Sequence, residues 1–323
     1  MNKTFICLGN EALGGALTSC LENCGYTRAD DFTQARYIFT YFPLLSALED
    51  AYFDAGGIMS KATKGTYLID LSPATPNFAR ELSAVASVSD LHFVEAPIGV
   101  LDPALDDAFS DSENLQCTIA GDAPDTAVVK ELLELFVGQV FTLNEPGSAQ
   151  LAHAAWSLQQ TAQIFSAIES EALYRAMRGI PTAAAAASDG EAAVVGPLQA
   201  AVVQAVSEKR FHGSYTVEMF MADLSAALTA ADEVGLILPQ AEACMNLLDL
   251  LATIGGIDYA PAALALIYDE EEAAHQAGLD WARAAEYNEE MGAHSHDHIG
   301  FADDDDDESF GGYADLFGDF SNN

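Results

Sequence analysis

Apolar residues occur in short runs along the first 145 residues, and stretches with helical spacing separate these runs, for example at 77–87 and 125–136. Several runs are apolar nearly throughout rather than alternating, which is typical of strands covered on both faces. The predicted strands are 4–8, 37–42, 66–71, 92–96, 115–120 and 139–143. Alternation of strands and helices predicts an α/β fold with a doubly wound parallel sheet.

The pattern changes after Gly147. No glycine or proline interrupts residues 148–178, which predicts one helix about 46 Å long at 1.5 Å per residue. Gly179 and Pro181 are suited to end it. Further helices are predicted at 197–207, 216–233, 239–253 and 259–290. The chain therefore divides into an α/β domain (1–146), an all-α domain (147–291) and a tail (292–323).

The tail lacks apolar periodicity, so disorder is expected there. His294, His296 and His298 alternate, and on an extended chain they would lie on one side, as ligands of Zn²⁺ or Ni²⁺ do. No cysteine lies nearby to complete a tight site, so a solvated tail is favoured over a metal site. The run Asp303–Asp307 precedes several aromatic residues. This segment is either a docking segment for a protein partner or, as we favour, a solubilising end.

The charge excludes some functions. The 323 residues include 12 Lys+Arg and 50 Asp+Glu, for a net charge of −38. Even without the eight acidic residues from Asp303 onward, the rest of the chain carries −30. This charge argues against nucleic acid or an anionic membrane as a partner. No apolar run reaches the 18–20 residues of a membrane span, and the five scattered cysteines are typical of reduced thiols, so a cytoplasmic location is expected.

The first predicted strand runs into a helix through residues 7–12, Cys-Leu-Gly-Asn-Glu-Ala. This layout is that of a dinucleotide phosphate turn, in which backbone N–H groups at a helix N-terminus face a pyrophosphate. Gly9, Asn10, Glu11 and Ala12 are therefore the candidate cofactor-binding residues. Only the middle glycine of the usual three is present.

Further segments resemble those of one family in order and spacing over about residues 1–270. They are 70–76 (Asp-Leu-Ser-Pro-Ala-Thr-Pro), 93–99 (Phe-Val-Glu-Ala-Pro-Ile-Gly), 118–122 (Thr-Ile-Ala-Gly-Asp), 147–150 (Gly-Ser-Ala-Gln) and 222–224 (Ala-Asp-Leu). Together they resemble the β-hydroxyacid dehydrogenases, which include 3-hydroxyisobutyrate and 6-phosphogluconate dehydrogenases; imine reductases are similar. The resemblance implies a Rossmann-like domain, a long interdomain helix, NAD or NADP as cofactor, and a homodimer. It also places Ser72 at the cofactor and Gly99 and Asp223 at the substrate.

The chain departs from this family at its chemistry. The family's catalytic lysine and the asparagine four residues on correspond to His153 and Ser157, and a second lysine corresponds to Ala222. The serine that would hold a substrate carboxylate corresponds to Gly99. About twenty residues are missing between Gly25 and Arg36, where the family holds adenosine, although Arg28 resembles a remnant of its phosphate-binding arginine.

Two possible functions follow from this resemblance and from the departures from it. The leading one is an NAD(P)-dependent oxidoreductase acting on a small carbonyl/hydroxy or imine/amine substrate. Histidine side chains in general exchange protons near neutral pH, so His153 would exchange the proton, with Ser157 one turn along the same helix face. The alternative for this pair is a polar stripe without catalytic role. The competing function is a family member that has lost catalysis and acts by binding.

Overall fold

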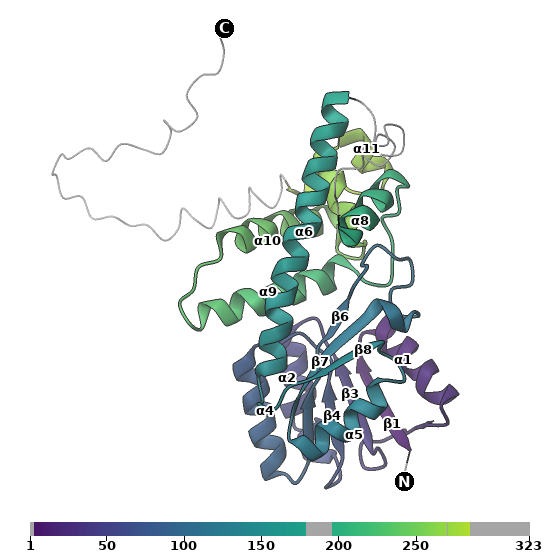
Figure 1. Ribbon diagram of the computed structural model, residues 1–323, viewed down its shortest axis with the longest axis vertical. Helices are drawn as coiled ribbons and strands as arrows, with labels where there is room; N and C mark the ends of the chain where they lie inside the picture. Colours follow the sequence, from purple (N-terminus) through teal and green to yellow (C-terminus); the bar gives the residue numbers. More distant parts are fainter. Residues whose placement is uncertain (1–2, 179–195, 270, 285–323) are drawn as a thin grey trace, which may run out of the picture. The chain divides into compact units, whose positions relative to one another are not determined.

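The computed structural model describes residues 3–178, 196–269 and 271–284 (Figure 1). They belong to one compact unit, Met1–Ala284. The strands are β1 Thr4–Gly9, β2 Thr27–Arg28, β3 Tyr37–Tyr41, β4 Tyr67–Asp70, β5 His92–Glu95, β6 Ile98–Val100, β7 Leu115–Gly121 and β8 Gln139–Thr142. The helices are α1 Glu11–Asn23, α2 Leu45–Phe53, α3 Ile58–Lys61, α4 Pro76–Val88, α5 Ala123–Leu133, α6 Ser148–Arg178, α8 Pro197–Ser207, α9 Val217–Asp232, α10 Pro239–Leu251 and α11 Glu271–Gln276.

The strands form one sheet in the order β2-β1-β3-β4-β5-β7-β6, and β8 also pairs with β7. The parallel arrangement predicted from the sequence is confirmed from β2 through β5. Strand β7 is the exception, because it runs antiparallel to both β5 and β6. The physical reason is the connection: no crossover helix lies between β5 and β7, and parallel neighbours need one. The sequence pattern also failed to predict β6.

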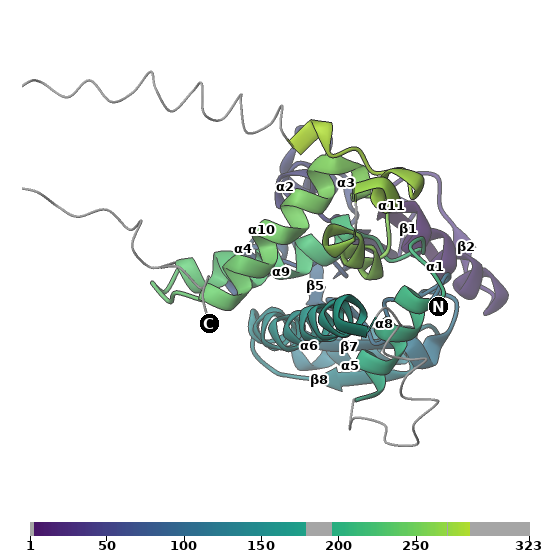
Figure 2. The ribbon, with the colours of Figure 1, turned by 90° about the horizontal axis from the view of Figure 1, so that it is seen from above.

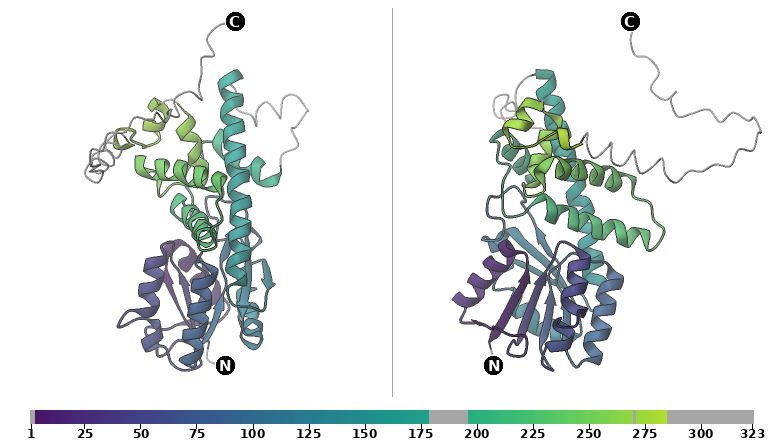
Figure 3. Two further views of the ribbon diagram at one scale, coloured as in Figure 1. Left: turned by 90° about the vertical axis from the view of Figure 1, so that its left-hand side faces the viewer. Right: turned by 180° about the vertical axis from the view of Figure 1, so that it is seen from behind.

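Helices cover both faces of the sheet, which explains the continuously apolar strands (Figure 3). One face carries Phe5 and Phe39, which belong to a core with Leu17 of α1 and Val129 of α5. The opposite face carries Ile38, Leu68 and Phe93, which belong to a second core with residues of α2 and α4 such as Leu48 and Leu82. The predicted doubly wound α/β domain is therefore confirmed.

Helix α6 has the predicted bounds and connects the sheet to the helical part of the chain (Figure 1). It contacts β7 and α4, and it also packs against α8, α9 and α10. Figure 2 shows α6 lying alongside β7. Ile164, Phe165 and Ile168 are buried on it. Because α6 packs against both the sheet and the other helices, its side chains can reach the sheet edge and the helical core.

The prediction of one long helix over 259–290 was wrong. A 3₁₀ segment, Pro261–Tyr268, and the short helix α11 take its place in the described residues. Proline restarts the helix at 261, and a left-handed glycine, Gly278 (φ +94°), follows α11. The domain division at 146/147 stays a prediction. The tail, with His294, His296, His298 and the acidic-aromatic run, lies outside the described residues.

Among the described residues, no single helix has the length and apolar character to cross a membrane. One bent pair, Pro239–Gly256 with Pro261–Tyr268, meets the length and composition test with an 89° bend.

Candidate functional site

The turn after β1 requires glycine. Gly9 has φ +102°, and a Cβ at this position would lie 1.9 Å from the carbonyl oxygen of Tyr41 in the neighbouring strand β3. The backbone N–H of Asn10 donates to that same oxygen at 2.9 Å. This hydrogen bond holds the turn at the end of β3. The N-terminus of α1 therefore lies at the carboxyl edge of the sheet.

The side chain of Asn10 caps α1. Its Oδ1 accepts the backbone N–H groups of Ala12 (3.0 Å) and Leu13 (3.2 Å). Glu11 adds a negative charge in the first turn of the helix. The backbone frame fits a diphosphate, because a helix N-terminus and a left-handed glycine face the same edge. Asn10 must release its two donors before an anion can take them, and Glu11 disfavours that anion.

The region where the family resemblance places adenosine is short, as the sequence predicted. Strand β2 has only two residues, ending at Arg28, and the chain then turns directly into β3. Two exposed acids, Asp30 and Asp31, follow Arg28. No further strand lies beyond β2 in the described sheet.

Ser72 is buried in hydrogen bonds of the protein itself. Its Oγ accepts the N–H of Phe42 at 3.0 Å, and its own N–H donates to Asp70 Oδ1 at 3.1 Å. Its carbonyl oxygen accepts from Nε2 of Gln150 at 2.9 Å. Burial raises the pKa of Asp70 to about 6, although bonds from Ser72 and Thr40 oppose the shift. Ser72 therefore ties β3 and β4 to α6; a contact with cofactor stays a prediction.

The carboxylate of Glu95, at the end of β5, caps the long helix. Its two oxygens accept the N–H groups of Gly147 (2.5 Å) and Gln150 (3.1 Å). Burial raises the pKa of Glu95 to about 7, against the opposing effect of these N–H groups. Glu95 lies in one of the segments that resemble the family, but the sequence indicated no role for it. The residues at the start of α6 that it binds lie about fifty positions further along the chain.

His153 of α6 and Asp223 of α9 meet in the buried interior. Nε2 of His153 lies 2.8 Å from Oδ1 of Asp223, and the Tyr215 hydroxyl donates to Oδ2 at 2.5 Å. The three residues are 6%, 2% and 1% exposed, respectively. Burial and the Asp223 carboxylate raise the pKa of Tyr215 well above its usual value, so its phenol stays protonated. We call His153, Asp223 and Tyr215 the His–Asp–Tyr cluster.

Two more residues approach this cluster. Ser157 donates its hydroxyl to the Ala154 carbonyl at 3.0 Å and lies 3.3 Å from the carbonyl oxygen of Asp223. Tyr41 is 3% exposed, and burial with the charges of Asp223 and Glu218 raises the pKa of its phenol. The structure thus brings predicted residues His153, Ser157 and Asp223 together. It also adds Tyr215, whose hydroxyl bonds to Asp223, to this group.

The arrangement allows proton exchange at one atom of His153. When Asp223 is ionised, Nε2 of His153 donates to it, which leaves Nδ1 as the nitrogen with a free lone pair. Asp223 thereby selects the tautomer and orientation of the ring. Tyr215 holds the second carboxylate oxygen and so restrains Asp223.

Gly99 lies on β6 against α6. A Cβ at this position would be 3.0 Å from the Trp156 ring, and Gln160 Nε2 donates to the carbonyl of the next residue, Val100, at 2.6 Å. The close approach explains glycine here, where a serine would press on Trp156. A substrate contact of Gly99 stays a prediction. Among the described residues, no group of three or more metal-ligating side chains occurs.

The fold defines a class: a Rossmann-like α/β sheet joined to a helical part by one long helix. Residues 21–136 match the family model "NAD binding domain of 6-phosphogluconate dehydrogenase". This match begins after the Gly9 turn.

Individual relatives are distant. The chain is 22% identical to an uncharacterized oxidoreductase, YkwC, of Bacillus subtilis (strain 168), over 79% of this chain and 95% of that protein. It is 23% identical to 2-hydroxy-3-oxopropionate reductase of Escherichia coli (strain K12), over 68% and 73%. A crystal structure of 3-hydroxyisobutyrate dehydrogenase from Salmonella typhimurium has a TM-score of 0.67 at 18% identity, covering 82% of this chain and 99% of that one. The predicted resemblance to the 6-phosphogluconate and 3-hydroxyisobutyrate dehydrogenases is confirmed, and the low identities fit a divergent sequence.

Proposed function

We propose that this protein is a nicotinamide-dinucleotide-dependent oxidoreductase in which His153 exchanges the proton that accompanies hydride transfer. The observation that carries the proposal is the bond between His153 Nε2 and Asp223 Oδ1 at 2.8 Å, which orients an imidazole on the interdomain helix. The match of residues 21–136 to an NAD-binding family model supports the cofactor class.

The residues have distinct roles in this proposal. The Gly9 turn and the first N–H groups of α1 would hold the diphosphate, and the bound dinucleotide would supply or accept the hydride. His153 gives a proton to the substrate oxygen or nitrogen during reduction and takes it back during oxidation. Asp223 and Tyr215 position the ring. Ser157 borders the same cluster.

The substrate is proposed to be a small carbonyl/hydroxy or imine/amine compound. Gly99 has no hydroxyl to hold a carboxylate at the position where relatives are expected to carry serine. A simple 3-hydroxy acid is therefore disfavoured as substrate.

Charge near β2 favours NADH over NADPH. A 2′-phosphate would meet Arg28 but also two exposed carboxylates, Asp30 and Asp31. Two like charges outweigh one opposite charge, whereas an acid at this place in the fold accepts hydrogen bonds from ribose hydroxyls.

Thermal unfolding with each cofactor tests the proposal. NADH at a hundredfold excess over its dissociation constant adds about 2.7 kcal/mol of stability, a rise in Tm of about 5 °C. NADPH should give a smaller rise. Absence of any shift with both cofactors at millimolar concentration would contradict an oxidoreductase function.

A second candidate is a catalytically impaired member that acts as a binding protein. It is favoured by the burial of the whole His–Asp–Tyr cluster, whose members are at most 6% exposed. This candidate would be supported if the protein binds cofactor but turns over no carbonyl or imine compound tested. In that case His153→Ala should also leave cofactor binding unchanged.

We also propose that the chain forms a homodimer through its helical part. The turn between α9 and α10 exposes Val234, Leu236 and Ile237 (77%, 55% and 74%), an apolar surface suited to a second copy. A cytoplasmic location stays a prediction.

A further inference from the structure

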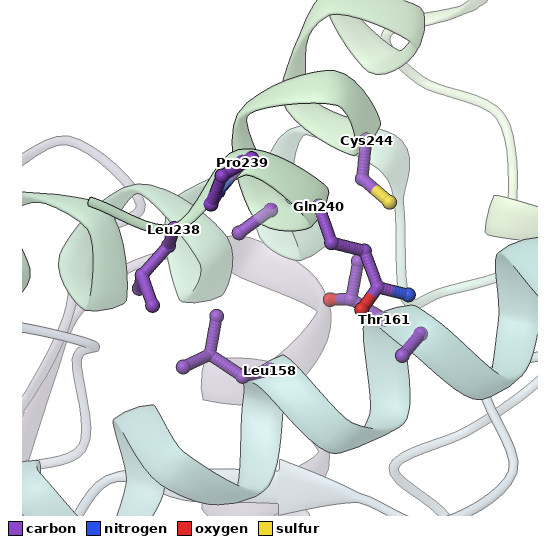
Figure 4. Close-up of a pocket in the computed structure, with 8 residues that line it drawn as sticks. Leu158, Thr161, Leu238, Pro239, Gln240 and Cys244 are labelled. Atoms are coloured by element: carbon purple, nitrogen blue, oxygen red, sulfur yellow. The ribbon is translucent and has the colours of Figure 1, made fainter.

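A cavity of about 190 Å³ lies between α6 and the start of α10 (Figure 4). Three residues of α6 form one wall, and the first residues of α10 form the other. The lining residues are Leu158, Thr161, Ala162, Leu238, Pro239, Gln240, Ala241 and Cys244. None of them carries a formal charge at neutral pH, and burial raises the pKa of the Cys244 thiol to about 11. The cavity is thus apolar except for a few polar groups.

The hydroxyl of Thr161 is one of these polar groups, and it has no partner. Thr161 is 2% exposed, and its Oγ1 makes no hydrogen bond within the described residues. Figure 4 shows Thr161 and the amide of Gln240 converging on the space between the helices. A buried hydroxyl without a partner is unfavourable, so a ligand atom that accepts its proton would be stabilised there.

The N-terminus of α10 opens on the same cavity. The helix has 13 residues and begins with Pro239, and Leu238 at the capping position provides no side-chain oxygen. The N–H groups of Gln240 and Ala241 therefore have no acceptor within the helix. Together with the helix dipole they form a region of partial positive charge, which attracts anions. Glu242, one residue further on, is exposed and is not among the residues that line the cavity.

We propose that this cavity binds the carboxylate of a small organic acid. The carboxylate accepts from the N–H groups of Gln240 and Ala241 and from the Thr161 hydroxyl. The apolar body of the acid packs against Leu158, Ala162 and Leu238. The site goes beyond the proposed oxidoreductase function, because it needs no dinucleotide and lies about 12 Å along α6 from His153.

Size and charge select this class of ligand. An apolar cavity of about 150 Å³ can hold benzene, so the space suits an acid of four to six carbon atoms in total. A phosphate dianion is disfavoured, because no lysine or arginine lines the cavity. A neutral amide of the same shape cannot use the positive field of the helix.

Calorimetric titration of the full chain with butyrate, butyramide and inorganic phosphate tests the proposal. Butyrate is expected to bind in the millimolar range or tighter, butyramide at least tenfold more weakly, and phosphate more weakly than butyrate. Equal binding of butyrate and butyramide, no binding of butyrate at 50 mM, or tighter binding of phosphate would overturn it.

Variants locate the site. Thr161→Val removes the hydroxyl with little change of shape and should weaken butyrate about tenfold, whereas Thr161→Ser should retain binding. Thr253→Val is the matched control, since that hydroxyl already donates to the Asp249 carbonyl. Leu238→Asp gives α10 its own capping carboxylate, so it should abolish butyrate binding and raise Tm. Unchanged butyrate affinity in both Thr161→Val and Leu238→Asp would reject this location.

Discussion

Asp223 Oδ1 lies 2.8 Å from Nε2 of His153, and this contact joins α9 to α6 where both helices are buried. The second oxygen of the same carboxylate accepts from Tyr215. A buried carboxylate with two charge-assisted donors is well satisfied, whereas either donor without it would be left unpaired. The contact therefore stabilises the fold and, in the proposed reaction, orients the proton-exchanging ring.

Asp223→Asn tests both consequences. The amide keeps the shape but lacks the charge that strengthens the hydrogen bonds to His153 and Tyr215, so we expect a loss of stability of about 1–3 kcal/mol. Any reductase turnover should fall at least a hundredfold, because an amide no longer fixes the tautomer of His153. Urea unfolding and initial rates measure the two effects.

The control for this variant is Asp232→Asn, an exposed acid in the same helix. It should change stability by no more than about 0.5 kcal/mol. Equal destabilisation by the two variants would show that the His–Asp–Tyr cluster has no special role in the fold.

Glu95 makes stability depend on pH. Its pKa is raised from 4.5 to about 7 in the folded protein, so the folded state holds a proton that the unfolded state releases. The stability gained is fully present below about pH 4.5 and is lost as pH rises through about 7, a change of about 3 kcal/mol. Asp70, with a pKa of about 6, acts in the same direction.

Glu95→Gln resembles the protonated acid at every pH. We therefore expect the variant and the wild type to have similar stability at pH 4.5 and the variant to be more stable at pH 7.5, as measured by urea unfolding across this range. Glu113→Gln, at an exposed acid, should leave the wild-type profile unchanged. Parallel profiles for Glu95→Gln and wild type would contradict the raised pKa.

The sequence predicted those parts of the molecule whose cause is local. The bounds of α6 were correct because Gly147 precedes a stretch without glycine or proline. The turn at Gly9 and the shortened region after Gly25 were also readable from spacing. Strand β6 was missed because its three residues form a strand only through pairing with β7. The helix over 259–290 was wrong because apolar spacing does not distinguish an α-helix from the 3₁₀ segment that follows Pro261.

The candidate site was predicted only in part, because motif positions are local features of the sequence and contacts between elements are not. His153, Ser157 and Asp223 were named from motif positions, and packing of α9 on α6 brings them together. The bonds from Tyr215 to Asp223 and from Gly147 to Glu95 depend on chain paths between elements, which no local pattern specifies.

Glu11 should weaken dinucleotide binding. It is in the first turn of α1, next to the donors that a diphosphate would use. Removing this charge by Glu11→Gln should increase the affinity for NADH about two- to fivefold. This factor corresponds to the Coulomb energy of two unit charges several ångströms apart in water. Glu22→Gln, in the last turn of the same helix, serves as the control and should have no effect. Fluorescence titration with NADH decides the matter; equal affinities for Glu11→Gln and wild type would argue against a diphosphate at this turn.

Ile237 should contribute to self-association. Its side chain is 74% exposed in the α9–α10 turn beside exposed Val234 and Leu236, and a charge there would have to be desolvated on burial between two copies. We expect Ile237→Lys to raise the dimer dissociation constant at least tenfold in sedimentation equilibrium, with little effect on the folded monomer. Val88→Lys is the matched control, because Val88 is 88% exposed at the end of α4, away from this turn. A dimer that survives Ile237→Lys but is lost in Val88→Lys would place the interface on the α/β part instead.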